Sequence, residues 1–275
     1  MSSQRNLERW ARAWRRSARR WEAFAPALRW ATGWRIWNPA AYGETWHARF
    51  RRCYPPSGHP LLVFGLNPGP YGMAQTGIPF TDLRRLESAL PQLARELQDA
   101  GERLVQPGLA PRSLRPFLER SFESSSVRVY RFLERAWGSA EIGWKEVVVA
   151  NPCPLLFMDP VERKNRTPAD LAKTVRLLRG RAAAHDARER SDRLRREGAA
   201  EALEALEPRG VVLLGRDVQA ILGPLFSRSL GERAVVSFEH PARAVPEVWS
   251  SGLIAILAAR GLLADGPASA KARRK

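Results

Sequence analysis

The chain has 275 residues, of which 44% are hydrophobic and 27% charged, a composition that excludes a wholly disordered chain. Its formal net charge of +17 is far from that of an ordinary globular protein and favours a polyanionic partner such as a nucleic acid. Nearly all of its basic residues are Arg, which binds phosphate through paired hydrogen bonds; GC-rich codon usage explains Arg in place of Lys, but not the excess of basic over acidic residues.

The first predicted element is a basic, Trp-rich helix within residues 1–33. Trp10, Trp14 and Trp21 follow an i, i+4, i+11 spacing, so they share one helical face, with many Arg side chains around them. Three interpretations stay open: the helix packs on the main domain, contacts a nucleic acid as a basic arm, or lies on a membrane surface. At the other end of the chain, residues 264–275 are predicted to form a basic, disordered tail.

From residue 34 onwards, short apolar runs alternate with amphipathic stretches. Strands are predicted at 59–66, 145–150, 210–215 and 234–238. Helices are predicted at 82–100 with a break at Pro91, at 124–138 with a Ser cap and a Gly stop, at 167–180 with a Thr cap, and at 186–206, 216–227 and 246–263. Four short apolar runs, each followed by a helix, indicate an α/β fold with a buried parallel sheet.

Polar residues follow each predicted strand at the point where it ends. Asn67 follows the first strand, Asn151 the second, Arg216 and Asp217 the third, and His240 the fourth. Because ligands of parallel α/β sheets bind outside the carboxyl ends of the strands, two amides and an imidazole are expected to converge there. Such a set can bind a flat polar heterocycle: an amide pairs with one base edge, a Phe stacks on its face and Arg holds phosphate.

Other common chemistries lack their motifs in this sequence. There is no GxSxG nucleophile elbow, no GxGxxG or GxxxxGK[ST] phosphate loop, and no HxxxH or carboxylate-rich metal motif. Cys53 and Cys153 are too few for a four-cysteine cluster and indicate a reducing, cytoplasmic compartment, nucleoid-associated if the source is bacterial. The apolar runs are too short to span a bilayer, so no membrane partner is expected.

The segment GLNPGPYGMAQTGIPF, residues 65–80, closely resembles the first motif of the single-strand-selective monofunctional uracil-DNA glycosylases, family 3 of the uracil-DNA glycosylase superfamily. Three further segments are similar to segments of that family: 37–54, 151–171 (NPCPLLFMDPVERKNRTPADL) and the His-Pro motif EHPAR at 239–243. The resemblance covers about residues 34–263. It implies one three-layer α/β/α domain around a central four-stranded, mainly parallel sheet.

The same resemblance implies an activity and a set of site residues. The activity is hydrolysis of the N-glycosidic bond of uracil, and of some 5-modified uracils, in DNA, by a monomer that needs neither a metal nor a cofactor. Deaminated purines are further substrates within the superfamily. By position in the motifs, Asn67 orients the attacking water, His240 stabilises the departing base, Asn151 reads the base edge, Phe80 stacks on the base, and Gly69 and Met73 form the pocket wall.

The chain departs from the family's pattern after His240. The sequence HPARAVPEVW is shorter than the family's segment and lacks its Ser-Pro and Asn-Pro pairs. In the family this region wedges into duplex DNA, a task that here falls to Arg243, with Val245 beside it. The preference between single- and double-stranded DNA therefore stays open.

Two other functions remain as alternatives. A nucleic-acid-binding protein could keep the fold without the chemistry, although the presence of both Asn67 and His240 argues against this. An amino-group methyltransferase is the other, because NPCP at 151–154 loosely resembles an Asn-Pro-Pro-aromatic motif; the sequence lacks the Gly-rich cofactor loop that such an enzyme carries after its first strand.

Overall fold

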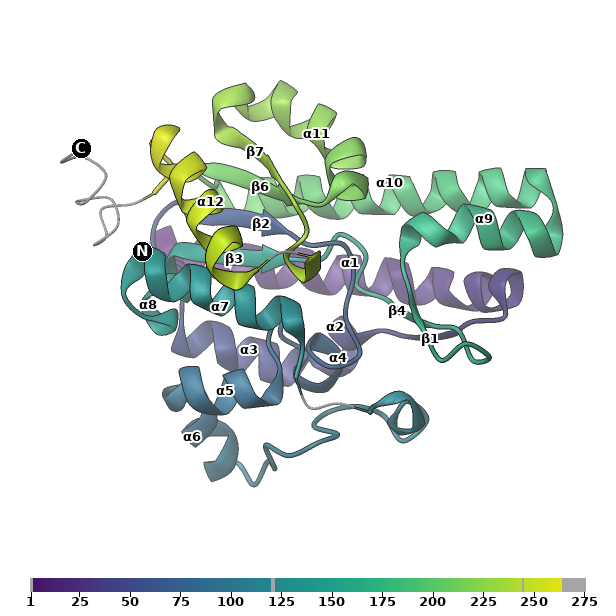
Figure 1. Cartoon of the computed structure of the whole chain (residues 1–275), viewed down its shortest axis with the longest axis horizontal. Helices are drawn as coiled ribbons and strands as arrows, with labels where there is room; N and C mark the ends of the chain where they lie inside the picture. Colours follow the sequence, from purple (N-terminus) through teal and green to yellow (C-terminus); the bar gives the residue numbers. More distant parts are fainter. Residues whose placement is uncertain (1, 120–121, 244, 264–275) are drawn as a thin grey trace.

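The computed structural model describes residues 2–119, 122–243 and 245–263, without the side chains of residues 2, 3 and 243. Its centre is a four-stranded sheet of order β3-β2-β6-β7 (Figure 1). The strands are β2 (Leu61–Phe64), β3 (Val147–Ala150), β6 (Gly210–Leu214) and β7 (Val235–Phe238). All three pairings are parallel, so the predicted strands and the predicted α/β class are confirmed.

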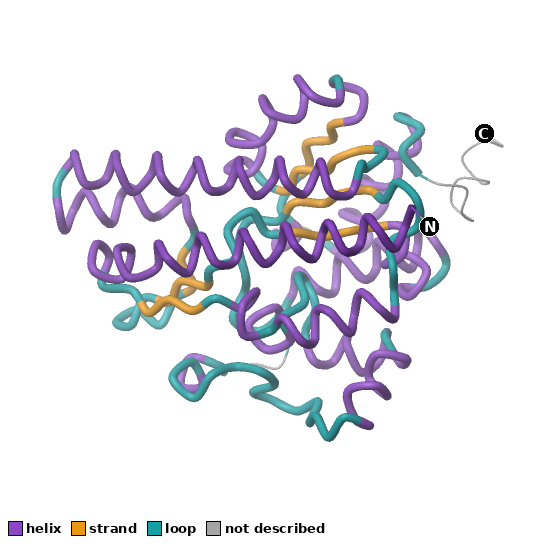
Figure 2. The backbone as a smooth tube through the Cα atoms, turned by 180° about the vertical axis from the view of Figure 1, so that it is seen from behind, coloured by secondary structure: helices purple, strands orange, loops and turns teal. Residues whose placement is uncertain are grey.

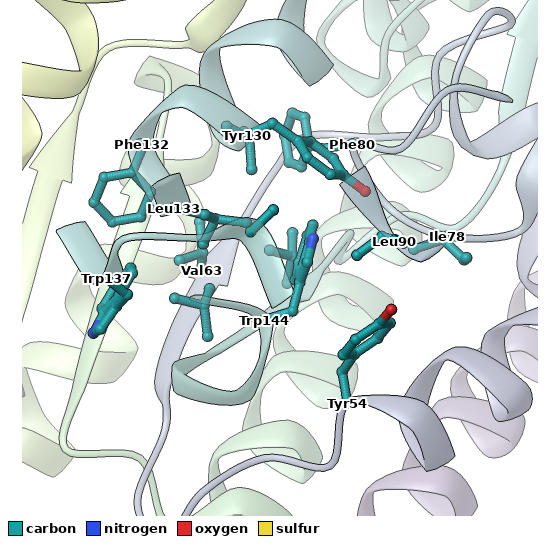
Figure 3. Close-up of a cluster of buried hydrophobic side chains, with 14 of the residues drawn as sticks. Tyr54, Val63, Ile78, Phe80, Leu90, Tyr130, Phe132, Leu133, Trp137 and Trp144 are labelled. Carbon is teal, nitrogen blue, oxygen red and sulfur yellow. The ribbon is translucent and has the colours of Figure 1, made fainter. Parts of the chain in front are cut away.

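Helices cover both faces of this sheet and make three layers (Figure 1). One face packs against α7 (Ser124–Trp137), α8 (Ala140–Glu146) and α12 (Pro246–Ala259). The opposite face packs against α1 (Ser2–Thr32), α10 (Arg181–Leu206) and α11 (Arg216–Leu230). The strands are buried on both sides because alternate residues feed two separate apolar clusters: Leu61 and Val63 point into one, Leu62 and Phe64 into the other. Figure 3 shows part of the first cluster, with Phe80 beside residues of α7 and α8.

A second, smaller sheet was not predicted. It is antiparallel, has the order β1-β4-β5, and consists of β1 (Arg35–Trp37), β4 (Leu156–Met158) and β5 (Asn165–Arg166). Strands of two or three residues are too short to show a periodicity in the sequence. This sheet holds the segment that follows Asn151 in a fixed position next to the carboxyl edge of the main sheet.

The remaining elements connect the layers. They are α2 (Pro39–Tyr42), α3 (Glu44–Cys53), α4 (Met73–Thr76), α5 (Leu83–Ala89), α6 (Pro91–Asp99) and α9 (Pro168–Arg179), with the 3₁₀ turns η1 (Arg115–Phe117), η2 (Glu232–Ala234) and η3 (Pro241–Arg243). The α9–α10 pair forms a long helical hairpin that extends away from the sheet (Figure 1).

Most helix boundaries lie close to the predicted ones, but α11 ends three residues later than predicted and α12 four residues earlier. Pro91 separates α5 from α6, and Thr167 is the N-cap of α9, as predicted; Thr167 and Asp170 form a capping box there. The N-cap of α7, however, is Glu123 and not a Ser, because the Asp82 carboxylate accepts the Glu123 backbone N–H at 3.0 Å and fixes the chain there. Helix α10 begins at Arg181, five residues before the predicted start.

Helix α1 lies alongside α10 on the back of the molecule (Figure 2). Trp10, Trp14 and Trp21 are all buried, at 3%, 6% and 0% exposed, so the tryptophan face serves packing. Its Arg side chains pair with α10 and its C-cap, for example Arg20 with Glu201 at 2.8 Å. The division of the chain at residues 33 and 263 stays a prediction, and the tail at 264–275 lies outside the described residues.

Trp21→Ala is expected to lower the free energy of unfolding by about 3–5 kcal/mol, because it empties a fully buried indole site. Trp30→Ala is the matched control: Trp30 is 66% exposed and contacts mainly the Arg179 guanidinium, so its loss should cost about 1 kcal/mol or less. Urea titrations followed by circular dichroism measure both. A loss of about 1 kcal/mol or less for Trp21→Ala, no greater than that of the control, would contradict the contribution of Trp21 to the core.

Candidate active site

A cleft of about 1030 Å³ lies at the carboxyl edge of the main sheet. Residues that follow three of its strands line it: Asn67 and Gly69 after β2, Gly215 to Gln219 after β6, and Glu239 and His240 after β7. The N-terminal parts of α7 and α9 close the other sides. The structure therefore brings Asn67, Gly69, Phe80 and His240 together in one cleft, whereas Asn151 and Met73 do not line it.

The Asn67 amide is oriented by backbone carbonyls. Its Nδ2 donates long hydrogen bonds to Pro68 O and Arg166 O, both at 3.3 Å, and to Leu155 O at 3.5 Å. Two of these acceptors belong to the segment that carries β4 and β5, so the small sheet helps to hold the side chain. Because the nitrogen faces three carbonyls, the Oδ1 atom is the one left to accept a hydrogen bond from a ligand or a water in the cleft.

The tautomer of neutral His240 is set by a turn in its own motif. The backbone N–H of Ala242 donates to His240 Nδ1 at 3.2 Å, so the ring proton lies on Nε2 and this nitrogen is a donor. Two side chains that sequence reasoning missed hold the segment: Gln219 Nε2 donates to Phe238 O at 2.7 Å, and Trp249 Nε1 donates to Glu239 O at 3.0 Å.

Phe80 faces His240 across the cleft. The two ring centroids are 6.4 Å apart at an interplanar angle of 47°. Phe80 has a φ of 52°, in the left-handed region that side chains avoid at a cost of about 1–3 kcal/mol. Hydrogen bonds in the preceding turn maintain this conformation, including one from Thr76 Oγ1 to Thr81 O at 2.8 Å.

Asn151 and Met73 are buried together next to this aromatic ring. Asn151 Nδ2 donates to Met73 Sδ at 3.3 Å, and a Cβ on Gly65 would lie 2.7 Å from both Asn151 Oδ1 and the Phe80 ring. The absence of a side chain at Gly65 therefore lets the amide and the ring meet. Asn151 Oδ1 has no hydrogen-bond partner among the described residues, a state that costs about 1–3 kcal/mol in a buried site and is relieved by a ligand donor.

Glu123 is a further cleft residue that the sequence analysis missed. Its Oε1 accepts a hydrogen bond from Ser125 Oγ at 2.7 Å and lies 2.5 Å from where a Cβ on Gly69 would be. The pKa of the Glu123 carboxyl is raised to about 7, mainly by burial. The hydrogen bond from Ser125 opposes this rise, and the negative charge of Asp82 adds to it. In the sequence, Glu123 is an acidic residue directly before the serines that begin a predicted helix. An acidic residue at such a position usually caps the helix, so the sequence does not indicate a site residue.

The remaining predictions concern metals, cysteines and Arg243. No group of three or more His, Cys, Asp or Glu side chains within the described residues could hold a metal ion. Cys53 and Cys153 are free and buried, and burial raises the pKa of each thiol to about 12. None of the helices in the described ranges is long and apolar enough to cross a bilayer. Arg243 ends η3, and its side chain lies outside the described part of the structure.

Comparison with known proteins places the chain in a family. The model of the uracil DNA glycosylase superfamily matches residues 53–247. The chain belongs to this superfamily. The matched stretch includes every cleft residue described above, from Asn67 to His240.

Curated relatives confirm the resemblance to the single-strand-selective monofunctional uracil-DNA glycosylases. The single-strand selective monofunctional uracil-DNA glycosylase of Rattus norvegicus is 34% identical over 139 residues, which are 50% of this chain and 46% of that protein. The protein of the same name from Bos taurus is 32% identical over 139 residues, 47% of its length. The chain thus spans about half the length of the curated relatives it matches.

A solved structure supports the fold. The crystal structure of wild-type Pedobacter heparinus SMUG2 superimposes with a TM-score of 0.56 at 23% sequence identity, over 84% of this chain and 88% of that one. At this identity the likeness shows the fold alone. It agrees with the three-layer α/β/α arrangement around the parallel sheet.

Proposed function

We propose that the protein is a monofunctional uracil-DNA glycosylase, which hydrolyses the N-glycosidic bond of uracil in DNA, leaves an abasic site and so initiates base-excision repair. The observation that carries the proposal is the placement of an oriented amide, Asn67, and an Nε2–H donor, His240, in one cleft of a superfamily member, with Phe80 across from the imidazole. The names of the curated relatives support the same activity.

The substrate base must leave the DNA helix before it can enter the cleft, at a cost of a few kcal/mol that is smaller for a single strand. Phe80 then stacks on the base. Asn151 reads its edge: Oδ1 accepts the N3–H of uracil, and Nδ2 gives up the weak thioether acceptor of Met73 for uracil O4. Gly69 forms the wall beside the ring, and Met73 completes this wall from behind, through its contact with Asn151.

Bond cleavage places negative charge on the departing base and positive charge on the sugar. The C1′–N1 bond breaks with its electron pair moving to uracil, and His240 Nε2–H donates to uracil O2, where the charge gathers. Asn67 Oδ1 holds the water that attacks C1′. Each role uses an atom whose orientation the surrounding backbone already fixes.

DNA binding draws on the excess of positive charge, with a formal net charge of +17. Beside the cleft we assign the wedge between bases to Arg243, together with Val245, which is 60% exposed. We further propose that the protein acts as a monomer in the cytoplasm, that it needs no cofactor, and that its substrates extend to 5-modified uracils and deaminated purines.

The test is release of free base from synthetic DNA by purified protein in the presence of EDTA. Uracil, 5-hydroxymethyluracil, hypoxanthine and xanthine are placed in single- and double-stranded oligonucleotides under single-turnover conditions. Uracil release with an intact strand supports the proposal. A protein that binds these oligonucleotides but releases no base from any of them would be a binding protein that kept the fold without the chemistry.

A further inference from the structure

The geometry points to Glu123 as the proton acceptor for the attacking water, a catalytic role that complements Asn67. The inference rests on the proposed function, because it concerns the water that the Asn67 amide holds. An amide can orient a water but cannot take its proton at neutral pH. A carboxylate in the same cleft can.

The Glu123 carboxyl lies close against the loop that carries Asn67. Its Oε1 lies 2.5 Å, and its Oε2 3.3 Å, from the position of a Cβ on Gly69; a Cβ on Gly72 would overlap Oε2. Gly69 is two residues beyond Asn67, a span of at most about 7 Å of chain. The two glycines thus leave the space that the carboxyl occupies, in the same cleft that Asn67 lines.

The backbone of Glu123 is as firmly held as its side chain. Its N–H donates to Asp82 Oδ2 at 3.0 Å, while Asp82 Oδ1 accepts the N–H of Arg85 at 2.8 Å and caps α5. Ser125 Oγ donates to Oε1 at 2.7 Å. No ion pair involving Glu123 occurs within the described ranges.

The charge state of Glu123 suits a base near neutral pH. Its pKa is raised to about 7, mainly by burial. Of the neighbouring groups, the Ser125 hydroxyl lowers the pKa and the Asp82 charge raises it. The titratable and charged groups that line the cleft from the other elements are Arg216 and Asp217 at the start of α11 and Glu239 and His240 after β7. A base with a pKa close to the working pH is both ionised and strong enough to accept a proton.

The chemical step balances with the groups present. The C1′–N1 bond breaks and its electron pair leaves with uracil, which takes a proton from solvent after release. The water oxygen forms the new bond to C1′, and one water proton passes to a Glu123 carboxylate oxygen. A negative carboxylate in the cleft would also stabilise the positive charge that develops on the sugar in the transition state.

The experiment measures single-turnover uracil release from saturating single-stranded DNA between about pH 5.5 and about pH 9. Ionisation of a base with a pKa of about 7 should change the rate within this pH range. The wild-type rate is expected to rise with pH through about 7 and then level off, since only the ionised carboxylate accepts a proton. Glu123→Gln should lose this rise and be slower by about 10²-fold at the plateau.

Two further variants separate catalysis from structure. Ser125→Ala removes the hydrogen bond that lowers the Glu123 pKa, so its rate should rise at higher pH than the wild-type rate. Glu87→Gln, at an exposed position on α5, removes the same charge away from the cleft and should keep the wild-type profile.

A Glu123→Gln variant that is folded and keeps the wild-type rate and pH rise overturns the inference. If the variant is slow but keeps the pH rise, Glu123 only shapes the Gly69–Gly72 loop, and the inference is equally overturned. Failure of the wild-type protein to release uracil at any pH is a different result, because it removes the proposed function itself.

Discussion

Asn67→Ala is expected to slow uracil release by about 10³-fold or more while the affinity for uracil-containing DNA changes by no more than about twofold. The variant keeps the cleft but loses the Oδ1 atom that holds the water. The Nδ2 atom also loses its contacts with Leu155 O and Arg166 O, which are long and contribute little to stability. Single-turnover base release and fluorescence anisotropy of labelled oligonucleotides measure the two quantities.

The thermal midpoint of the Asn67→Ala variant serves as its control, because an unfolded fraction would lower the rate and the affinity together. A variant that is folded and releases uracil at a rate near that of the wild type would show that another group positions the water. A variant that loses DNA affinity in proportion to its activity would instead assign Asn67 to binding.

His240→Ala is expected to reduce single-turnover uracil release by about 10²–10³-fold, the usual effect of removing one donor that stabilises a developing anion. The removed atom is the Nε2–H, whose position follows from the bond between Ala242 N–H and Nδ1. His240→Gln offers an amide N–H at a similar reach and should recover part of this loss.

The substrate's leaving group provides an independent check on the imidazole. A base that leaves more easily, such as 5-fluorouracil, needs less stabilisation, so the His240→Ala variant should be impaired less on it than on uracil. An equal loss on both bases would mean that His240 acts in binding or in positioning, since a role in stabilising the leaving base requires the difference.

The strands of the main sheet could be predicted because they are buried on both faces. Residues 61–64 and 211–214 are uninterrupted apolar runs, which the parallel sheet requires and which a half-exposed strand would not show. Once the strands were placed, the topology of parallel sheets brought Asn67 and His240 to one edge. That part of the site follows from local patterns together with one general rule.

The rest of the site depends on contacts between segments that are far apart in the sequence. Glu123 enters the cleft because Asp82 fixes its backbone, 41 residues away, and because Gly69 and Gly72 leave room for its carboxyl. The burial of Asn151 beside Phe80 depends in the same way on the missing side chain at Gly65. Side-chain packing of this kind has no periodicity, so composition and spacing could not predict it.

The docking of α1 on α10 has a consequence for the synthesis of the chain. A ribosome completes the tryptophan face of α1 well before it reaches Arg181, where α10 begins. At about 5–20 residues per second, the intervening stretch takes on the order of ten seconds. During that time Trp10, Trp14 and Trp21 lack the surface that later buries them, and an isolated helix is only marginally stable. Chaperones that bind nascent chains at exposed aromatic residues should therefore bind α1 before α10 is synthesised.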